Sequence, residues 1–185
     1  MIYLMRHGLD DESYVGGYSD IDLIDEGIEQ VRDVGKWLCE MDFIFENIYT
    51  SDVKRTITTA NIINKYLELP LILDGNLREL DKGVLNGMKK DIAMDLYFKY
   101  MVNKDINVKY PGGESMMEFY LRIKDLLNDF SKYENSLVVT HRGVINMIYY
   151  ILLRMDVDFD KEKFDVVHAS VHELDLKKSK IRRIR

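Results

Sequence analysis

The first chemically informative residues are an arginine and a histidine that directly follow a short apolar segment at the start of the chain. Ile2-Tyr3-Leu4-Met5 has the composition of a buried strand, and Arg6-His7-Gly8 follows it at once. The carboxyl end of a strand in an open parallel sheet faces the crevice in which ligands bind. An imidazole beside a fixed cation at such a place can attack a phosphoryl group. His7 is therefore a candidate nucleophile, and Arg6 is a candidate anion-binding residue.

Three further candidate residues lie at the ends of predicted strands or just beyond them. Arg55 stands at the beginning of a predicted helix, Glu79 follows Leu77-Arg78, and His141 directly follows the apolar strand 137–140. Strand ends that are distant in sequence meet at one edge of a parallel sheet. The sequence thus predicts one site that combines two histidines, two arginines and a carboxylate.

The elements that must position these residues follow from the periodicity of the apolar side chains. Helices are predicted where apolar residues recur every three or four positions, in segments 25–41, 54–67, 115–133 and 142–153. Strands are predicted at 2–5, 47–50, 71–73, 137–140 and 171–176, the last of them at an edge of the sheet. Ser115 and Glu118 have the spacing of a capping box. Strands that alternate with helices predict an α/β fold, a three-layer α/β/α sandwich around a mostly parallel central sheet.

The length and the apolar content predict a single domain over residues 1–185. A chain of 185 residues with 46% hydrophobic residues can bury one substantial core, and nothing in it marks a linker. Between Gly87 and Pro111 the regular pattern breaks, and aromatic residues and methionines fall on more than one side. We expect a small helical cap insertion at about 88–110. Its apolar residues either hold the cap together or present an apolar wall to a substrate.

Charge and composition restrict the partners. The net charge of −6 argues against a general surface for nucleic acid or anionic membrane, and we expect neither partner. The basic segment 177–185 either binds a polyanion or forms a solvated final hairpin. No apolar segment reaches the roughly 18 residues of a membrane span. The single cysteine, Cys39, cannot form a disulfide within the chain, so a reducing compartment is expected. We expect its side chain on the core face of a helix. These features together predict a cytoplasmic protein. The apolar residues 148–151 belong either to the core or to the interface of a homodimer.

Six motifs occur in one order along nearly the whole chain. They are Arg6-His7-Gly8, the segment 17–23 with Glu26-Gly27, Ser51-Asp52 with Arg55-Thr56, Leu77-Arg78-Glu79, the segment 111–115, and Thr140-His141. In this order the chain resembles the histidine phosphatase superfamily, which has the phosphoglycerate-mutase-like fold. The resemblance implies a metal-independent phosphomonoesterase without a cofactor, which hydrolyses a small phosphorylated metabolite through a phosphohistidine intermediate.

The resemblance also implies a role for each candidate residue. His7 would be the nucleophile, while Arg6, Arg55 and the catalytic His141 would bind the phosphoryl oxygens. Glu79 would protonate the leaving alcohol and then deprotonate the attacking water. Two guanidinium groups and a cationic His141 would balance the charge of the transition state. The same positive surroundings would disfavour a proton on His7 and keep it neutral.

The chain departs from the pattern of the family at three positions. Leu9 stands where Glu or Gln often follows the first motif. Ser13 falls where an Asn commonly assists phosphate binding, so its hydroxyl is a candidate phosphate contact. Arg142 replaces the small residue that usually follows the second histidine. It either adds a third guanidinium to the phosphate site or points away to a surface carboxylate.

A metal site is the alternative reading of several acidic and imidazole side chains. Asp10-Asp11-Glu12 offers oxygen ligands for a hard cation, but three adjacent carboxylates on one loop are more typical of a solvated turn. His7 and His141 lie beside predicted arginines, which oppose cation binding. No metal is therefore expected. His168 and His172, near the last strand, are expected to be structural or surface residues.

Two other functions compete with hydrolysis. The first is a cofactor-dependent phosphoryl transfer of the phosphoglycerate mutase type, but mutases of the family carry a longer insertion with more basic residues. The insertion here has no arginine, and its lysines are Lys89, Lys90, Lys99, Lys104 and Lys109. The second is a non-catalytic protein that binds phosphorylated ligands. The presence of both His7 and Glu79 argues against this function.

Overall fold

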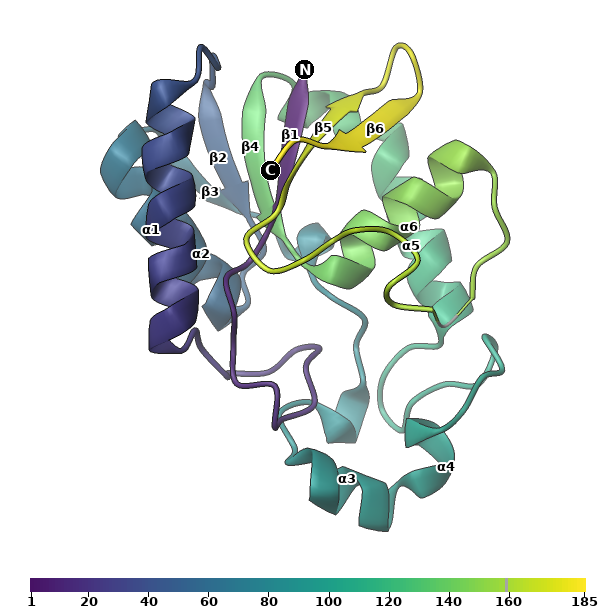
Figure 1. The fold of residues 1–185 in the computed structure, drawn as a ribbon. Helices are drawn as coiled ribbons and strands as arrows, with labels where there is room; N and C mark the ends of the chain where they lie inside the picture. Colours follow the sequence, from purple (N-terminus) through teal and green to yellow (C-terminus); the bar gives the residue numbers. More distant parts are fainter. Residues whose placement is uncertain (159) are drawn as a thin grey trace.

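The computed structural model describes residues 1–158 and 160–185, which form one six-stranded sheet with helices on both faces (Figure 1). The strands lie in the order β3-β2-β4-β1-β5-β6. Their bounds are β1 (Ile2–Arg6), β2 (Asn47–Thr50), β3 (Leu71–Leu73), β4 (Ser136–Thr140), β5 (Val171–Asp175) and β6 (Lys180–Arg183). The first four strands run parallel, and β5 and β6 are antiparallel to their neighbours. The predicted α/β fold with a mostly parallel sheet is confirmed.

The two central strands bring the predicted site residues to one level. Every residue of β1 and of β4 is buried, as is expected of parallel strands covered on both faces. In the register of this pair Arg6 lies opposite Thr140, so that His7 and His141 leave neighbouring strands side by side. The carboxyl ends of these strands point toward the side of the molecule where the short helices α3 (Lys90–Leu96) and α4 (Phe98–Met101) lie (Figure 1).

Four longer helices cover the sheet. Helices α1 (Asp25–Glu40) and α2 (Lys54–Leu67) pack on one face, where Tyr3 and Met5 belong to their core cluster. Helices α5 (Met116–Asn128) and α6 (Arg142–Leu153) pack on the other, together with Ile2 and Leu4. Successive side chains of a strand point to opposite faces, so one apolar strand supplies both cores. Among the described residues, no helix has the length and apolarity that a membrane crossing needs.

The predicted helix over 115–133 is interrupted in the structure. It begins as expected, because the Ser115 hydroxyl accepts from the amide of Glu118 while the Glu118 carboxylate accepts from the amide of Ser115. It ends at Asn128, and a separate 3-10 helix follows at Phe130–Tyr133.

Two predictions about the edges of the core are wrong. The strand around Val171 is interior, because residues 180–183 of the basic tail pair along its outer side as β6. The tail thus forms the solvated hairpin.

Cys39 is exposed and does not face the core. It lies one position beyond Leu38, and a rotation of about 100° per residue turns it away from the buried stripe of α1. Met41 follows the end of the helix and is exposed as well.

The segment 88–110 contains the two short helices and packs around a small apolar cluster. Val15, Leu85 and Ala93 are buried in it, and side chains from the insertion pack against them: Met88, Tyr97, Tyr100, Met101 and Tyr110. Most of the aromatic content of the insertion therefore holds this part of the chain together. Met101 also reaches the cavity that is described next.

Candidate active site

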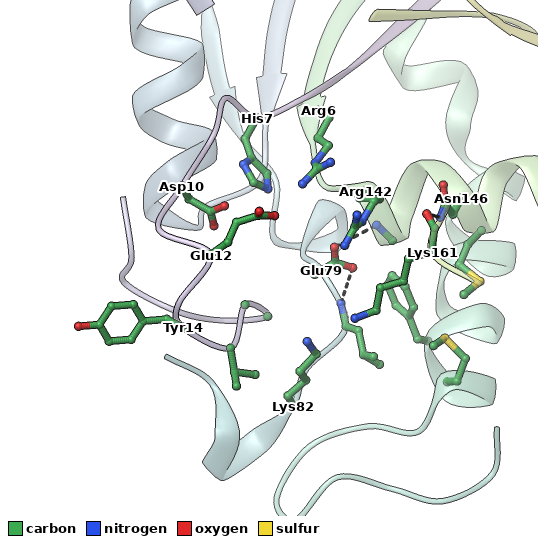
Figure 2. A pocket seen from close by; sticks show the side chains of 18 of the residues that line it. Arg6, His7, Asp10, Glu12, Tyr14, Glu79, Lys82, Arg142, Asn146 and Lys161 are labelled. Carbon is green, nitrogen blue, oxygen red and sulfur yellow. Dashed lines mark hydrogen bonds between the residues drawn. The ribbon is translucent and has the colours of Figure 1, made fainter. Parts of the chain in front are cut away.

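A cavity of about 210 Å³ opens at the carboxyl ends of the central strands. Four of the predicted residues line it, namely Arg6, His7, Arg55 and Glu79, and so does Arg142 (Figure 2). His141 is completely buried directly behind them, with its ring centroid 5.4 Å from that of His7. The volume is below the roughly 300–1,000 Å³ of sites for drug-sized ligands. The cavity therefore suits a compact metabolite.

The imidazole of His7 is held in one tautomer. Its Nε2 accepts a hydrogen bond of 3.1 Å from Arg55 Nε, and a guanidinium can only donate. The proton of the neutral ring is therefore on Nδ1, which donates to the carbonyl of Gly8 at 2.8 Å. Burial lowers the pKa of His7 well below its usual value, and the positive charge of Arg55 lowers it further. His7 is thus a neutral imidazole whose Nε2 lone pair faces the guanidinium, as the sequence predicts.

Arg55 is the central cation of the site and is only 2% exposed. It stands in the first turn of α2, and its guanidinium donates to both histidines, reaching His141 Nδ1 at 3.0 Å. Its remaining donors reach the Ser19 hydroxyl at 3.1 Å and the Gly17 carbonyl at 2.9 Å. This network holds the two imidazoles at a fixed separation around one cation.

His141 has a lowered pKa in the free protein, whereas the expected cationic form belongs to the transition state. Burial lowers its pKa well below the usual value, and the guanidinium groups of Arg55 and Arg6 lower it further. Because Nδ1 accepts from Arg55, the proton is on Nε2, which donates to the Ser51 hydroxyl at 3.0 Å. A bound phosphoryl dianion would reverse the sign of the local field and favour protonation.

Arg6 connects the end of β1 with the loop before β5. Its Nη1 donates to the carbonyl of Val166 at 2.9 Å, and its Nη2 contacts His168 Nε2. Within the described part of the chain, its buried Nε has no hydrogen-bond partner. Burial and the charge of Arg142 lower the pKa of Arg6 to about 10, so the guanidinium remains charged near neutral pH.

His168 belongs to the site, contrary to its predicted structural or surface role. Its ring centroid lies 5.7 Å from that of His7, and its Nε2 is 3.7 Å from Asp10 Oδ1. The strand order places this histidine there, because β5 is the direct neighbour of β1. His172 does have a structural role, since it is buried between the hydroxyls of Tyr149 and Ser170.

Asp10 also faces the site, so the expectation of a solvated turn fails for this residue. Its Oδ2 lies 3.6 Å from Arg55 Nε. Burial opposes its ionisation, but the contact with His168 and the charge of Arg55 hold the pKa of Asp10 below its usual value. A buried carboxylate in this position partly compensates the positive charge of the arginines.

Glu79 is held by two backbone amides. Its Oε1 accepts from the amide of Leu80 at 2.9 Å, and its Oε2 accepts from the amide of Gly143 at 3.0 Å, in the first turn of α6 (Figure 2). The carboxylate therefore has a fixed position in the cavity. An acid placed there can reach the leaving group of a phosphoester that is bound at His7.

Two of the three departures from the family pattern, Ser13 and Arg142, differ in their position relative to the cavity. Ser13 is exposed, lies outside the residues that line the cavity, and donates its hydroxyl to Asp11 Oδ1 at 2.7 Å. Arg142 has the contact with a surface carboxylate that the second alternative predicts, and its contact with phosphate stays a prediction. It lines the cavity, and its Nη1 also donates to the exposed Glu162 at 2.9 Å.

One cluster in the described residues has the composition of a metal site. Ligand atoms of His7, Asp10 and His168 lie within 4.8 Å of one another. Two guanidinium groups contact the same atoms, however: Arg55 Nε donates to His7 Nε2, and Arg6 Nη2 lies against His168 Nε2. Positive charge at the ligand atoms opposes a cation and favours an anion.

Three polar residues line the part of the cavity beyond Glu79 and were not identified from the sequence. They are Lys82, Asn146 and Lys161 (Figure 2). Lys82 lies only three residues after Glu79, a spacing that is a usable signal. Asn146 is a polar residue among apolar neighbours in a predicted helix. Lys161 lies in a charged loop, and the sequence gives no indication that it folds back over the site.

Comparison with known proteins agrees with this geometry. The family model described as the histidine phosphatase superfamily (branch 1) matches residues 2–184. The chain therefore belongs to the histidine phosphatase superfamily, and the predicted membership and enzyme class are confirmed.

The relatives include both phosphatases and mutases. Phosphoserine phosphatase 1 of Hydrogenobacter thermophilus is 29% identical over 182 residues, which cover 90% of this chain and 85% of the relative. A 2,3-bisphosphoglycerate-dependent phosphoglycerate mutase of Methylobacterium sp. is 30% identical over 166 residues, covering 82% and 80%. The crystal structure of the α-ribazole phosphatase from Shigella flexneri superimposes with a TM-score of 0.78 at 23% identity, covering 95% of this chain and 91% of the other. This last likeness shows the shared fold.

Proposed function

We propose that the protein is a metal-independent phosphomonoesterase that hydrolyses a small phosphorylated metabolite through a phosphohistidine at His7. The observation that supports this most directly is the buried unit of His7, Arg55 and His141. A neutral imidazole with a fixed tautomer lies there beside a guanidinium that contacts both histidines. Such a unit pairs a nucleophile with donors for the phosphoryl oxygens.

The first step transfers the phosphoryl group to the protein. His7 Nε2 attacks phosphorus, and the bond from phosphorus to the ester oxygen breaks. Arg55 Nε, which donates to this nitrogen in the free protein, turns to the phosphoryl oxygens as the new bond forms. Glu79 donates a proton to the departing oxygen, which leaves as an alcohol.

The second step regenerates the enzyme. Glu79, now a carboxylate held by the amides of Leu80 and Gly143, takes a proton from a water molecule. That water attacks phosphorus, and the bond to His7 Nε2 breaks to release inorganic phosphate. Arg6 and Arg55 compensate the charge on the phosphoryl oxygens in both steps. In the free protein the Nε of Arg6 has no partner within the described residues, and it can donate to such an oxygen.

A direct test is phosphate release in excess EDTA from a panel of phosphomonoesters, with wild type and His7→Ala side by side. We expect release by the wild type alone. Because the phosphorus–nitrogen bond of phosphohistidine is hydrolysed by acid, the reaction is quenched with alkaline denaturant. The wild-type protein should then carry phosphate on His7, as read by mass spectrometry of the intact chain and its peptides at neutral or alkaline pH. Turnover that survives in His7→Ala would refute the covalent route.

Mutase activity is the second candidate, because relatives with that activity align over most of the chain. Conversion of 3-phosphoglycerate to its 2-isomer, in the presence of the bisphosphate primer, would identify it. Phosphate release without isomer exchange favours hydrolysis. Tight phosphate binding with neither reaction would instead favour the non-catalytic alternative.

A further inference from the structure

Lysine side chains gather in the part of the cavity that lies beyond Glu79 as seen from His7. Lys82 comes from the segment after Glu79, and Lys161 comes from the loop between α6 and β5. Their ammonium groups lie on the same side of Glu79 (Figure 2). Lys90, in the first turn of α3, lines the same cavity. Three segments that are distant in sequence thus contribute positive charge to one place.

These lysines have no ion-pair partner within 4.0 Å in the part of the chain that the structure describes. Two of the carboxylates nearby are already engaged. Asp158 pairs with Lys163 and accepts from the hydroxyl of Tyr150, while Glu162 pairs with Arg142. The charge of Glu79 acts on Lys82 and Lys161 and compensates part of their charge.

The surroundings make a bound anion favourable. Burial and, to a smaller extent, the charge of Lys161 lower the pKa of Lys82 to about 8. Although the side chain of Lys161 is exposed overall, burial of its ammonium and the charge of Arg142 lower its pKa as well. Like charges that are crowded in a partly desolvated space repel one another, and an anion placed between them relieves the repulsion.

Asn146 adds a second, uncharged contact. It is 5% exposed and lines the cavity, and its Nδ2 donates to the carbonyl of Lys161 at 3.3 Å. Its Oδ1 is buried without a hydrogen-bond partner among the residues described. A buried acceptor without a partner is unfavourable, so it favours a ligand that donates a hydrogen bond.

We propose that Lys82 and Lys161, with Lys90 at the rim, bind a second anionic group on the leaving alcohol of the substrate, and that Asn146 Oδ1 accepts a hydrogen bond from that alcohol. The substrate is then a short phosphomonoester with a carboxylate or a second phosphate. The small volume of the cavity limits the distance between its two anionic groups. This inference rests on the proposed function, because it uses His7 as the place of the reacting phosphoryl group.

The test compares esters in which a second anionic group takes the place of a neutral hydroxyl. We choose 2-phosphoglycolate against 2-hydroxyethyl phosphate for a carboxylate, and propane-1,3-diol bisphosphate against its monophosphate for a phosphate. We expect kcat/KM to be about 10- to 100-fold higher for the doubly anionic member of at least one pair, the usual effect of charge-assisted hydrogen bonds. The pair with the larger ratio identifies the second group.

Substitution assigns the preference to the two lysines. The double variant Lys82→Gln/Lys161→Gln should reduce the ratio within the preferred pair to about threefold or less. The matched control is Lys104→Gln, an exposed lysine of the insertion that does not line the cavity. This control should keep the wild-type ratio. A ratio near one in the wild type, or a ratio that the double variant retains, would overturn the proposal.

Binding measurements separate this proposal from the proposed function. Titration calorimetry of His7→Ala with the same four esters requires no turnover. If a doubly anionic ester binds at least tenfold more tightly than its partner, the lysine site is supported whether or not the wild type hydrolyses any ester. If the wild type hydrolyses none of them, only the proposed phosphatase activity is refuted. Hydrolysis of p-nitrophenyl phosphate without any preference in either pair would refute only the lysine site. If the double variant does not fold, the wild-type ratios and this titration still decide.

Discussion

Replacement of Glu79 by Gln gives the sharpest test of the proposed acid. The substitution keeps the size of the side chain and removes the proton that the leaving oxygen needs. We expect kcat to fall by about 10² to 10⁴-fold for an alkyl phosphate such as glycerol 3-phosphate. For p-nitrophenyl phosphate the loss should be smaller by at least about tenfold, because p-nitrophenolate departs without a proton.

The structure also sets the expected cost in stability. The Glu79 carboxylate accepts two backbone hydrogen bonds, from Leu80 and from Gly143. The amide of Gln can accept only one of them with its single oxygen, so one bond of about 0.5–1.5 kcal/mol is lost. For a chain of this size that corresponds to a decrease in Tm of about 1–6 °C. The variant should therefore be folded at assay temperature, as measured by thermal unfolding.

A second substitution moves the same carboxylate without changing it. A Cβ added at Gly143 would lie 2.0 Å from Glu79 Oε1, so Gly143→Ala must displace the side chain. A displacement of about 1 Å can cost about 10²-fold in rate. Both variants should show the same contrast between the two leaving groups in steady-state kinetics. Equal losses on both substrates, or no loss in Glu79→Gln, would show that Glu79 is not the proton donor.

Three further predictions concern the cations and imidazoles of the site. Arg55→Lys should lower kcat/KM for p-nitrophenyl phosphate by about 10² to 10³-fold, because an ammonium lacks the rigid planar fork of donors with which the guanidinium reaches both His7 and His141. A loss below tenfold would contradict this bridging role. The lowered pKa of His7 implies that it loses its lone pair only well below pH 6.5. The acid limb of kcat/KM, corrected for the substrate's second ionisation near pH 6, should therefore lie there, and a limb at 6.5 or above would refute this assignment. Lys82, whose pKa is about 8, is charged below that pH, so the preference for a doubly anionic ester should decrease as the pH rises through about 8. A preference that is constant from pH 7 to 9.5 would exclude Lys82 as its source.

Local sequence patterns identified much of the fold. The segments 47–50, 54–67, 71–73 and 142–153 form elements with the predicted bounds. These elements depend on local periodicity and on burial on one or two faces, which a single segment displays. The motif residues His7, Arg55, Glu79 and His141 meet in one place because strand ends converge in any parallel sheet.

The strand order of the sheet could not be read in the same way. Val171–Asp175 alternates polar and apolar residues like an edge strand, yet the tail β6 covers its outer side. Strand order depends on long-range pairing and not on the local pattern. The same pairing brings His168 to the end of β1, where it contacts Arg6, although nothing in its own segment indicates a site.

The sequence by itself determined the family, the layers of the fold and the residues of the phosphoryl site, because these follow from motifs and periodicity. Only the tertiary structure decided the protonation of the site and its extension. The pKa of His141 is lowered because burial and two guanidinium groups act on it together, and no single segment contains that environment. Lys82, Asn146 and Lys161 form one surface only after a loop has folded over the cavity. The proposed choice of substrate therefore depends on contacts between distant segments, whereas the motifs already indicate the chemistry.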